Sequence, residues 1–206
     1  MKLNKRDGGA VQPSVLFGKR VVLNKSAPDC VLVDGNLREI SLFKYTGKIK
    51  IIVSLNSVHG FGTEELVRGF SRIMVVFNRV VVPIVITRDL PFAQKKFCED
   101  NDIDNLTMLS DYKYSSFGIN YGLLIKEQNI LTQAIIILDG DNVVRHFQYN
   151  KNTDQQLNYK KAYSSLTKII QSWSLYNFLF SNNNHKTIKI QEKTPRKDYY
   201  LNLLNG

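Results

Sequence analysis

The two cysteines, Cys30 and Cys98, are the side chains of this chain best suited to redox chemistry. Two thiols cannot build a disulfide framework or a four-thiolate zinc site, so they are either inert core thiols or part of a redox pair. His59, His146 and His185 lie far apart and have no cysteine or carboxylate partners at metal-ligand spacing. We therefore interpret each histidine as a surface or structural residue and expect no metal and no cofactor.

Two short polar segments have the composition of ion-binding turns. Gly60–Phe61–Gly62 precedes a helical pattern and resembles a phosphate-binding turn, but Glu64 and Glu65 follow it and would repel an anion. Asp139 and Asp141 could ligate calcium, although a tight hairpin turn explains them better. Neither segment is predicted to hold a ligand.

Apolar periodicity indicates the elements that position these residues. A polar, glycine-rich loop over 56–62 separates a buried strand from a helix that begins near Thr63, a suitable N-cap or first-turn residue. The expected strands are 15–17 and 21–23 (a short N-terminal hairpin), 30–33, 49–55, 80–87, 134–138 and 143–149, and the expected helices are 63–77, 89–98 and 159–173. Strand–helix alternation followed by a hairpin and a last helix predicts an α/β fold with a mixed sheet.

The chain has 206 residues, which suits one domain with additional ends. We expect a polar N-terminal arm over 1–14, a domain over 15–172 and a C-terminal extension over 173–206. The net charge of +10 is concentrated in the ends, with +5 in residues 1–25 and +3 in residues 183–206. Neither end has a dense run of Lys and Arg, so no nucleic-acid partner is predicted.

The N-terminus has no apolar core of a secretory signal, and the longest apolar run, Val80–Ile86, is too short to span a bilayer. A cytoplasmic protein with reduced thiols is therefore expected. Near the C-terminus, 186–190 alternates like an extra strand. An apolar cluster that would need a covering partner or a second copy comprises Leu175, Tyr176, Phe178, Leu179 and Phe180.

The string LPFAQKKFC at Leu90–Cys98 resembles the thiol peroxidase branch of the peroxiredoxins, where a near-identical string carries the resolving cysteine. Three further stretches resemble that family: APDCVLVDGNL at 27–37, LSD at 109–111 followed by FG and YG pairs, and AIIILD at 134–139. The resemblance covers about residues 15–170. It implies a thioredoxin-like fold with an N-terminal β-hairpin, a homodimer, and a thioredoxin-like protein as a redox partner.

The catalytic positions of that family are where the resemblance fails. The family loop reads Pro-x-x-x-Thr-x-x-Cys, and its cysteine, in the first turn of a helix, attacks peroxide as a thiolate. The resolving cysteine then captures the sulfenic acid as a disulfide. In this chain Asn56 replaces the proline, Gly60 the threonine and Thr63 the peroxidatic cysteine, while Gln133 replaces a remote arginine. No cysteine lies between residues 30 and 98, so no alignment of the loop supplies a thiol.

These substitutions predict a catalytically inactive pseudoenzyme that retains a binding role, through a dimer surface or a remodelled pocket near Thr63. The alternative is residual thiol-dependent peroxidase or redox activity through Cys98, which otherwise is a small half-buried helix residue. Cys30 is interpreted as a core residue. Four aromatic residues could line the former active site, although core and dimer packing explains them better: Tyr112, Tyr114, Phe117 and Tyr121.

Overall fold

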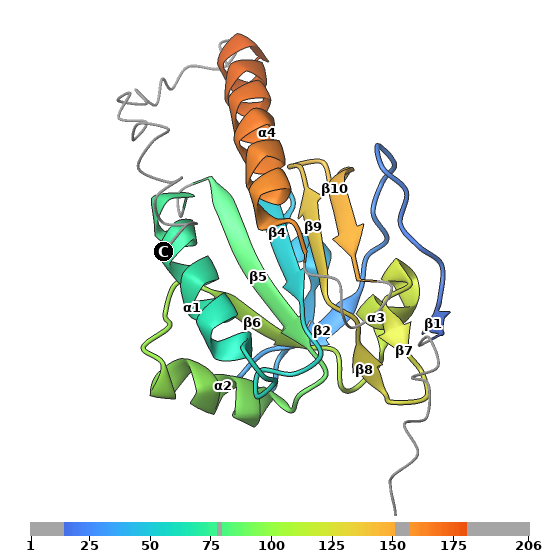
Figure 1. The fold of residues 1–206 in the computed structure, drawn as a ribbon. Helices are drawn as coiled ribbons and strands as arrows, with labels where there is room; N and C mark the ends of the chain where they lie inside the picture. Colours follow the sequence, from blue (N-terminus) through green and yellow to red (C-terminus); the bar gives the residue numbers. More distant parts are fainter. Residues whose placement is uncertain (1–14, 78–79, 151–156, 181–206) are drawn as a thin grey trace, which may run out of the picture.

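The computed structural model describes residues 15–77, 80–150 and 157–180, with side chains described up to residue 173. Its centre is a seven-stranded sheet in the order β10-β9-β4-β5-β6-β2-β3 (Figure 1). The strands are β2 (Val31–Val33), β3 (Glu39–Ser41), β4 (Ile49–Ser54), β5 (Val81–Thr87), β6 (Thr107–Ser110), β9 (Ala134–Leu138) and β10 (Val144–Tyr149). Strands β4, β5 and β6 are parallel and the other pairs antiparallel, so the predicted mixed sheet is confirmed.

Helices cover both faces of this sheet. One face carries α1 (Thr63–Met74), α2 (Pro91–Asp100) and α4 (Tyr159–Phe180), which contribute to one buried apolar cluster. The other face carries α3 (Ser116–Tyr121) and the segment before β2. Two 3-10 turns, η1 (Leu42–Tyr45) and η2 (Val75–Phe77), precede β4 and follow α1. A small second sheet joins β1 (Leu16–Phe17), β7 (Leu124–Ile125) and β8 (Ile130–Leu131).

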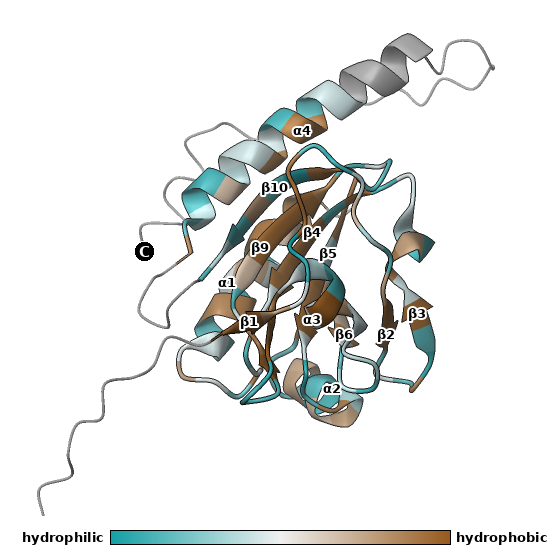
Figure 2. Ribbon diagram, turned by 90° about the vertical axis from the view of Figure 1, so that its right-hand side faces the viewer, coloured by the Kyte–Doolittle hydropathy of each residue, from teal (hydrophilic) through white to brown (hydrophobic). Residues whose placement is uncertain are grey.

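The central strands are apolar on both sides because both faces of the sheet are buried. In β4, Ile49, Ile51 and Val53 belong to the cluster beneath α1, α2 and α4, whereas Ile52 belongs to the opposite cluster. The strands therefore appear as continuous brown ribbons in Figure 2, in contrast to the teal connections around them. Continuous rather than alternating apolar character is typical of strands covered on both faces.

The N-terminal strand pairing differs from the prediction. Residues 21–23 form no strand, and β1 pairs instead with β7, far away in the sequence. The prediction was wrong because Gly18, between the two apolar segments, packs against the backbone of Ile119 rather than closing a turn. The N-terminal hairpin of the fold is the antiparallel pair β2–β3. Helix α4 also continues past Trp173, where the predicted helix ended, to Phe180.

Several expectations lie outside the described residues: the arm 1–14, the strand over 186–190 and His185. The side chains of the apolar cluster between Leu175 and Phe180 lie outside them as well. Among the helices that are described, none is long and apolar enough to cross a membrane.

Candidate functional site

The loop between β4 and α1 occupies the place where the sequence predicted the site. We call residues 55–62 the site loop. Its first residue is held by a backbone hydrogen bond from Leu55 N to Ile86 O (3.0 Å) of the neighbouring strand β5. Gly62 is the N-cap of α1 with φ of 71°, a left-handed conformation that glycine adopts without strain. Thr63 is therefore the first helical residue, and its hydroxyl does not cap the helix.

The Thr63 side chain fills the space beneath the site loop. Thr63 is only 5% exposed, and its amide donates to Gly60 O (3.1 Å). A Cβ atom added at Gly60 would lie 2.7 Å from Thr63 Oγ1, closer than such contacts normally come. A threonine at position 63 and a side chain at position 60 therefore compete for the same space.

Asp89 fixes the site loop from the neighbouring strand. Its carboxylate accepts hydrogen bonds from Ser57 Oγ (2.9 Å), Val58 N (2.7 Å) and Thr87 Oγ1 (2.9 Å). Asp89 was predicted to begin a helix, but α2 starts at Pro91 and the Asp89 side chain turns back to the loop. The sequence signal for this role of Asp89 is its position directly after an apolar strand. The C-terminal ends of neighbouring parallel strands lie at the same end of the sheet, so a polar residue there can reach the next loop.

A second layer of hydrogen bonds lies behind Asp89. Gln94, on α2, donates from Nε2 to Thr87 Oγ1 (2.9 Å) and to Leu109 O (3.0 Å). Ser110 Oγ, at the end of β6, donates to Asp89 O (2.5 Å). These bonds join the C-terminal ends of β5 and β6 to the site loop. We call this end of the sheet, at which β4, β5 and β6 terminate, the site end. These hydrogen bonds hold the site loop in one conformation.

Gln133 lies at the site end, whereas Cys98 lies near the C-terminal end of α2. Gln133 directly precedes Ala134, which pairs with Ser54, the last residue of β4. Its side-chain Oε1 accepts from Asn150 Nδ2 (3.2 Å), which ties it to the end of β10. Cys98 is on α2, whose C-cap Asn101 accepts from Arg68 Nε of α1 (2.7 Å). The structure therefore places Gln133 beside the end of β4, and no direct contact joins Cys98 to Thr63 among the described contacts.

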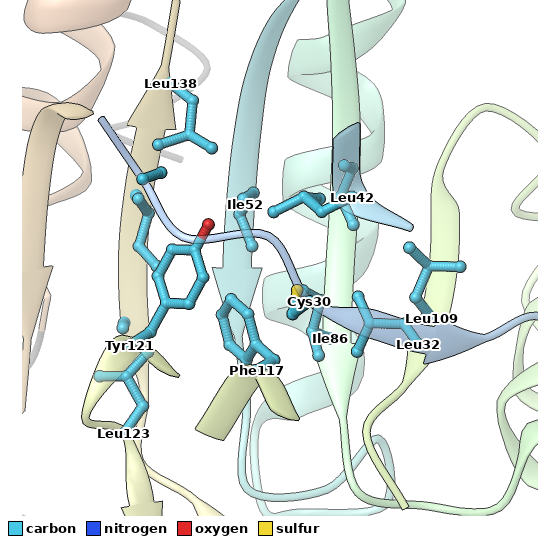
Figure 3. Packing of buried hydrophobic residues seen from close by; sticks show 14 of the residues in the cluster. Cys30, Leu32, Leu42, Ile52, Ile86, Leu109, Phe117, Tyr121, Leu123 and Leu138 are labelled. Carbon is cyan, nitrogen blue, oxygen red and sulfur yellow. The ribbon is translucent and has the colours of Figure 1, made fainter. Parts of the chain in front are cut away.

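Both thiols are poor nucleophiles. Burial and the neighbouring Glu99 carboxylate raise the pKa of Cys98 to about 11. Cys98 is half-buried, as predicted. Cys30 is 3% exposed and lies among Leu32, Leu42 and Ile86 in the core (Figure 3), so its core assignment is confirmed. Burial, followed by the charges of Asp111 and Asp29, raises the pKa of Cys30 well above the ordinary value.

The four aromatic candidates separate into two groups. Phe117 and Tyr121 are fully buried and stack with ring centroids 4.6 Å apart, so core packing is confirmed for them. Tyr114 is exposed and its hydroxyl donates to Glu39 Oε1 (2.5 Å), while Tyr112 is partly buried. The aromatic residues therefore do not form one lining above the site loop.

The other candidate residues have structural roles. His59 is exposed and contacts Phe97 edge to face at 6.2 Å, and His146 is buried beneath α4. Asp139 accepts from the amides of Asp141 (3.0 Å) and Val143 (2.9 Å), which confirms that it forms a hairpin turn. Within the described part of the chain, no group of three potential metal ligands is present.

A buried ion pair beside the site end was missed by the sequence analysis. Arg88 Nη1 donates to Ser115 Oγ (2.6 Å) and Asp111 O (2.9 Å), and lies 3.9 Å from Asp111 Oδ2. Burial raises the pKa of Asp111 to about 6, against the lowering effect of amide hydrogen bonds from Gly118 and Phe117. This pair fixes the segment before α3.

Apolar side chains are exposed on the segments that these hydrogen bonds connect. We call them the site-end apolar residues: Leu37, Phe61, Leu90, Phe92 and Tyr114, each at least 46% exposed. Asp89 joins the site loop, which carries Phe61, to the segment that carries Leu90 and Phe92. Arg88 joins that segment to the loop that carries Tyr114. Glu39 joins Tyr114 to the turn that carries Leu37. Clustered exposure of this kind marks an interaction surface more often than an isolated apolar residue does.

Comparison with known proteins identifies the class of this fold. The Redoxin family model matches residues 22–166, so the chain belongs to that family, and the predicted thioredoxin-like α/β fold is confirmed. Within it, the relatives are thiol peroxidases of the peroxiredoxin type. The thiol peroxidase of Streptococcus agalactiae is 34% identical over 150 residues, covering 73% of this chain and 91% of the relative. The thiol peroxidase of Staphylococcus saprophyticus is 35% identical over 133 residues, which cover 65% of this chain and 80% of the relative.

Solved structures support the same relationship. A peroxiredoxin-like protein from Aquifex aeolicus superposes with a TM-score of 0.69 at 29% identity, covering 75% of this chain and 91% of that one. A thiol peroxidase from Chromobacterium violaceum gives a TM-score of 0.67 at 25% identity, covering 76% and 92%. The matched region of the family model ends at residue 166, whereas α4 continues to Phe180. The chain is thus a member of the thiol peroxidase type of peroxiredoxin.

Proposed function

We propose that this protein is a thiol-peroxidase-like peroxiredoxin that is inactive as a peroxidase and acts by binding. The observation that carries the proposal is the absence of any cysteine between residues 30 and 98, which leaves Thr63 at the start of α1. A threonine hydroxyl stays protonated near neutral pH and cannot form the sulfenic acid that a resolving thiol would capture. We assign Thr63 to the peroxidatic position and Cys98 to the resolving position.

The packing of the site loop supports the proposal that several catalytic positions of the family have changed together in this chain. A Cβ atom added at Gly60 would lie 2.7 Å from Thr63 Oγ1, so the present Thr63 rotamer fits best beside a glycine at position 60. Asn56 and Gln133, at the positions of the family proline and arginine, would complete a set of four altered positions. Glu64 and Glu65 in the first turn of α1 further disfavour a thiolate at this helix end.

Peroxide consumption with thioredoxin and thioredoxin reductase tests this proposal. The full-length protein should show no turnover above the background rate without enzyme. A reconstructed variant provides the matched control, because Asn56→Pro, Gly60→Thr, Thr63→Cys and Gln133→Arg together should restore measurable turnover. Thr63→Cys alone should restore little. Robust turnover by the unaltered chain that disappears in Cys98→Ser would contradict the proposal.

The competing function is residual redox chemistry at Cys98, with an external thiol such as a thioredoxin-like protein as the resolving partner. The pKa of about 11 leaves only about one molecule in ten thousand as thiolate at neutral pH. We expect sluggish sulfenic acid formation at both cysteines under mild peroxide, as measured by mass spectrometry of trapped sulfenic acid. Selective oxidation of Cys98 at low peroxide would instead favour the redox function.

For the binding role, we propose a homodimer through the site-end apolar residues. These side chains belong to four segments that hydrogen bonds hold in one arrangement, so the surface is preformed. Phe61→Ser with Phe92→Ser should shift the solution mass, measured by light scattering, from dimer to monomer. Leu23→Ser, at an exposed residue elsewhere, is the matched control and should leave the mass unchanged. A monomeric unaltered protein would contradict the homodimer but not the loss of peroxidase activity.

We further propose that the domain over 15–172 has a separate polar arm before it and an extension from residue 173 onward, and that the protein is cytoplasmic. The two free thiols suit a reducing compartment. Limited proteolysis followed by mass spectrometry should yield a resistant fragment with these boundaries, and cell fractionation should recover the protein in the cytoplasm.

A further inference from the structure

Two adjacent residues after β5 fix two different loops. Asp89 holds the site loop, whereas Arg88 holds residues 112–115, which we call the tyrosine loop because it carries Tyr114. The Arg88 guanidinium donates from Nη1 to Ser115 Oγ (2.6 Å) and from Nη2 to Tyr112 O (3.3 Å). Arg88 therefore determines where Tyr114, one of the site-end apolar residues, is presented.

The tyrosine loop contains a strained residue. Ser115 has φ of 53° and ψ of 19°, in the left-handed region that serine seldom adopts. Its hydroxyl accepts from Arg88, and its amide donates to Asp111 O (3.2 Å). Such a conformation persists only where the surrounding contacts enforce it. If Arg88 moved away, Ser115 would be able to relax and the tyrosine loop would change its conformation.

Arg88 depends on the charge of Asp111. The Arg88 side chain is 8% exposed, the Asp111 side chain is fully buried, and Arg88 Nη1 lies 3.9 Å from Asp111 Oδ2. Arg88 Nε is buried and has no hydrogen-bond partner within the described part of the chain. A buried cation needs a neighbouring negative charge, because it has lost the water that would otherwise solvate it. A neutral Asp111 would therefore favour movement of the guanidinium into solvent.

The Asp111 carboxyl is held independently of Arg88. Its Oδ1 accepts from Phe117 N (3.0 Å) and its Oδ2 from Gly118 N (2.8 Å), so it would stay buried beneath α3 without the guanidinium. Burial raises the pKa of Asp111 to about 6, while the two amides and then the Arg88 charge lower it. Release of Arg88 would raise this pKa further. By linkage, acid therefore favours the state in which Arg88 is released.

Arg88 is the cation that faces Asp111, and the other titratable groups described around this carboxyl are neutral or acidic. Cys30, before β2, and Tyr121, on α3, stay protonated because burial raises the pKa of each. The Asp29 carboxylate accepts from the Cys30 amide (2.8 Å) and adds a negative charge on the same side. The charge of Asp111 therefore acts mainly on Arg88.

The other contact of Tyr114 is expected to persist in mild acid. The Tyr114 hydroxyl donates to Glu39 Oε1 (2.5 Å), and Lys113 Nζ lies 2.6 Å from the same oxygen. The hydrogen bonds from Lys113 and Tyr114 lower the pKa of Glu39, so this carboxylate stays ionised. A change in the tyrosine loop between neutral pH and about pH 5 would therefore originate at Arg88.

We propose that Arg88 and Asp111 form a pH-sensitive switch, which fixes the tyrosine loop at neutral pH and releases it in mild acid. Release displaces Tyr114 and weakens binding at the site end. This consequence for binding rests on the proposed homodimer, whereas the release of the loop does not.

Hydrogen exchange of the full-length protein, measured for single amides by NMR and expressed as protection factors, tests the release. The amides of Ser115 and Ile119, which donate to Asp111 O and Ser115 O, should lose protection about tenfold between about pH 7.5 and about pH 5. The midpoint should lie near pH 6. Val58, whose amide donates to Asp89, is the internal control and should keep its protection. Unchanged protection at Ser115 would overturn the proposal.

Variants assign the pH dependence to the pair. Asp111→Asn places a neutral group of the same shape beside Arg88 and should give low protection at Ser115 at both pH values. Arg88→Met removes the cation and should do the same, which keeps the test decisive if Asp111→Asn does not fold. Arg72→Met, at an exposed arginine of α1, is the matched control and should keep the pH dependence. A pH dependence that survives in Arg88→Met would overturn the proposal.

Light scattering at the same two pH values measures the consequence for binding. The dissociation constant of the homodimer should be about tenfold higher at about pH 5, and the difference should disappear in Arg88→Met. His59→Gln, in the site loop, should keep the difference. Equal dissociation constants at both pH values would overturn the control of binding. A monomeric unaltered chain would overturn the homodimer, and hydrogen exchange at Ser115 would then decide the switch by itself.

Discussion

At each end of the central sheet an aspartate side chain shapes a connection, but the two aspartates act over different distances in the sequence. At the site end, Asp89 accepts three hydrogen bonds and shapes the loop before α1. At the opposite end, Asp139 accepts three and shapes the turn between β9 and β10, and we call this end of the sheet the hairpin end. Asp89 joins segments more than thirty residues apart, whereas Asp139 acts within six residues. One aspartate therefore maintains tertiary structure and the other maintains a local turn.

The surfaces around these aspartates both expose apolar residues and carry charges of both signs. Glu64 and Lys95 are exposed at the site end, and Lys48 and Asp141 are exposed at the hairpin end. The family model matches both ends. The comparison teaches that one family scaffold fixes its connections in two ways, through distant partners at the site end and through a local turn at the hairpin end.

Removing the two aspartates should produce the largest effects. Asp89→Ala should lower the free energy of unfolding by about 3 kcal/mol, because three donors of the partly buried loop network lose a charged acceptor. Asp139→Ala should cost about 2 kcal/mol, since one of its donors, Arg145, is partly exposed. Urea unfolding measures both losses. Hydrogen exchange should rise at Val58 only in Asp89→Ala, and a rise there in both variants would contradict the distinction.

The two glycines in close contact should respond differently to a methyl group. Gly140→Ala should lower the free energy of unfolding by about 2 kcal/mol, because the added Cβ meets the rigid Trp173 ring. Gly60→Ala should cost less than about 1 kcal/mol, because Thr63 Oγ1 can rotate away. Tryptophan fluorescence in the folded state should change only for Gly140→Ala. Equal losses would show that the loop around Thr63 is as tightly packed as the α4 contact.

The sequence predicted the central elements of the fold well. Ile49–Leu55, Val80–Thr87 and Ala134–Leu138 are long apolar runs, and each forms a strand within one residue of the expected ends. The start of α1 at Thr63 was also predicted correctly, because a glycine-rich bend gives way there to helical spacing. Local composition was sufficient in each of these cases.

Other features depend on distant partners that local patterns do not reveal. The strand β1 was assigned to a hairpin because its true partner, β7, is over a hundred residues away. Asp89 was placed in a helix because only the folded sheet brings it to Ser57 and Val58. Nothing in the sequence of β4 indicates that Lys50 is buried, since the two carbonyl groups that accept from its ammonium belong to a turn before the strand.

Lys50 should make stability at the hairpin end depend on pH. Its ammonium donates to Lys48 O (2.8 Å) and Tyr45 O (3.1 Å), and burial lowers its pKa to about 8. At Lys50 the unfolded state therefore binds more protons between about pH 8 and pH 10.5, so the contribution of Lys50 to the free energy of unfolding should rise with pH in that window. Cys30 and Cys98 act in the opposite direction, because their pKa values are raised in the folded state. Relative to Lys50→Met, the unaltered chain should gain about 1 to 2 kcal/mol between about pH 8 and pH 9.5.

Urea unfolding of the unaltered chain and of Lys50→Met across that range measures this difference, below the range where the buried tyrosines titrate. In Lys50→Met the free energy of unfolding should fall as the pH rises, because the contribution of the two cysteines is no longer offset by Lys50. Lys48→Met, at an exposed lysine of the same turn, is the matched control and should show the pH dependence of the unaltered chain. The same pH dependence in Lys50→Met and in the unaltered chain would contradict the assignment to Lys50.

The smallest expected effect concerns His146, which lies on β10 beneath α4. Its Nδ1 is 3.1 Å from Ser165 Oγ, and burial, with a smaller contribution from Lys161, lowers its pKa. The unfolded state therefore binds more protons as the pH falls below about 6.5, so the His146 contribution to stability should be lost on acidification. Asp111, with a pKa of about 6, acts in the opposite direction, because its protonated form is favoured in the folded state.

The informative quantity is therefore the difference in the free energy of unfolding between the unaltered chain and His146→Gln, measured by urea unfolding at about pH 7 and about pH 5. That difference should shift by less than about 1 kcal/mol in favour of the variant at the lower pH. A shift in favour of the unaltered chain would mean that the imidazole gains a stabilising partner when charged, and that α4 is held more tightly in acid than at neutral pH.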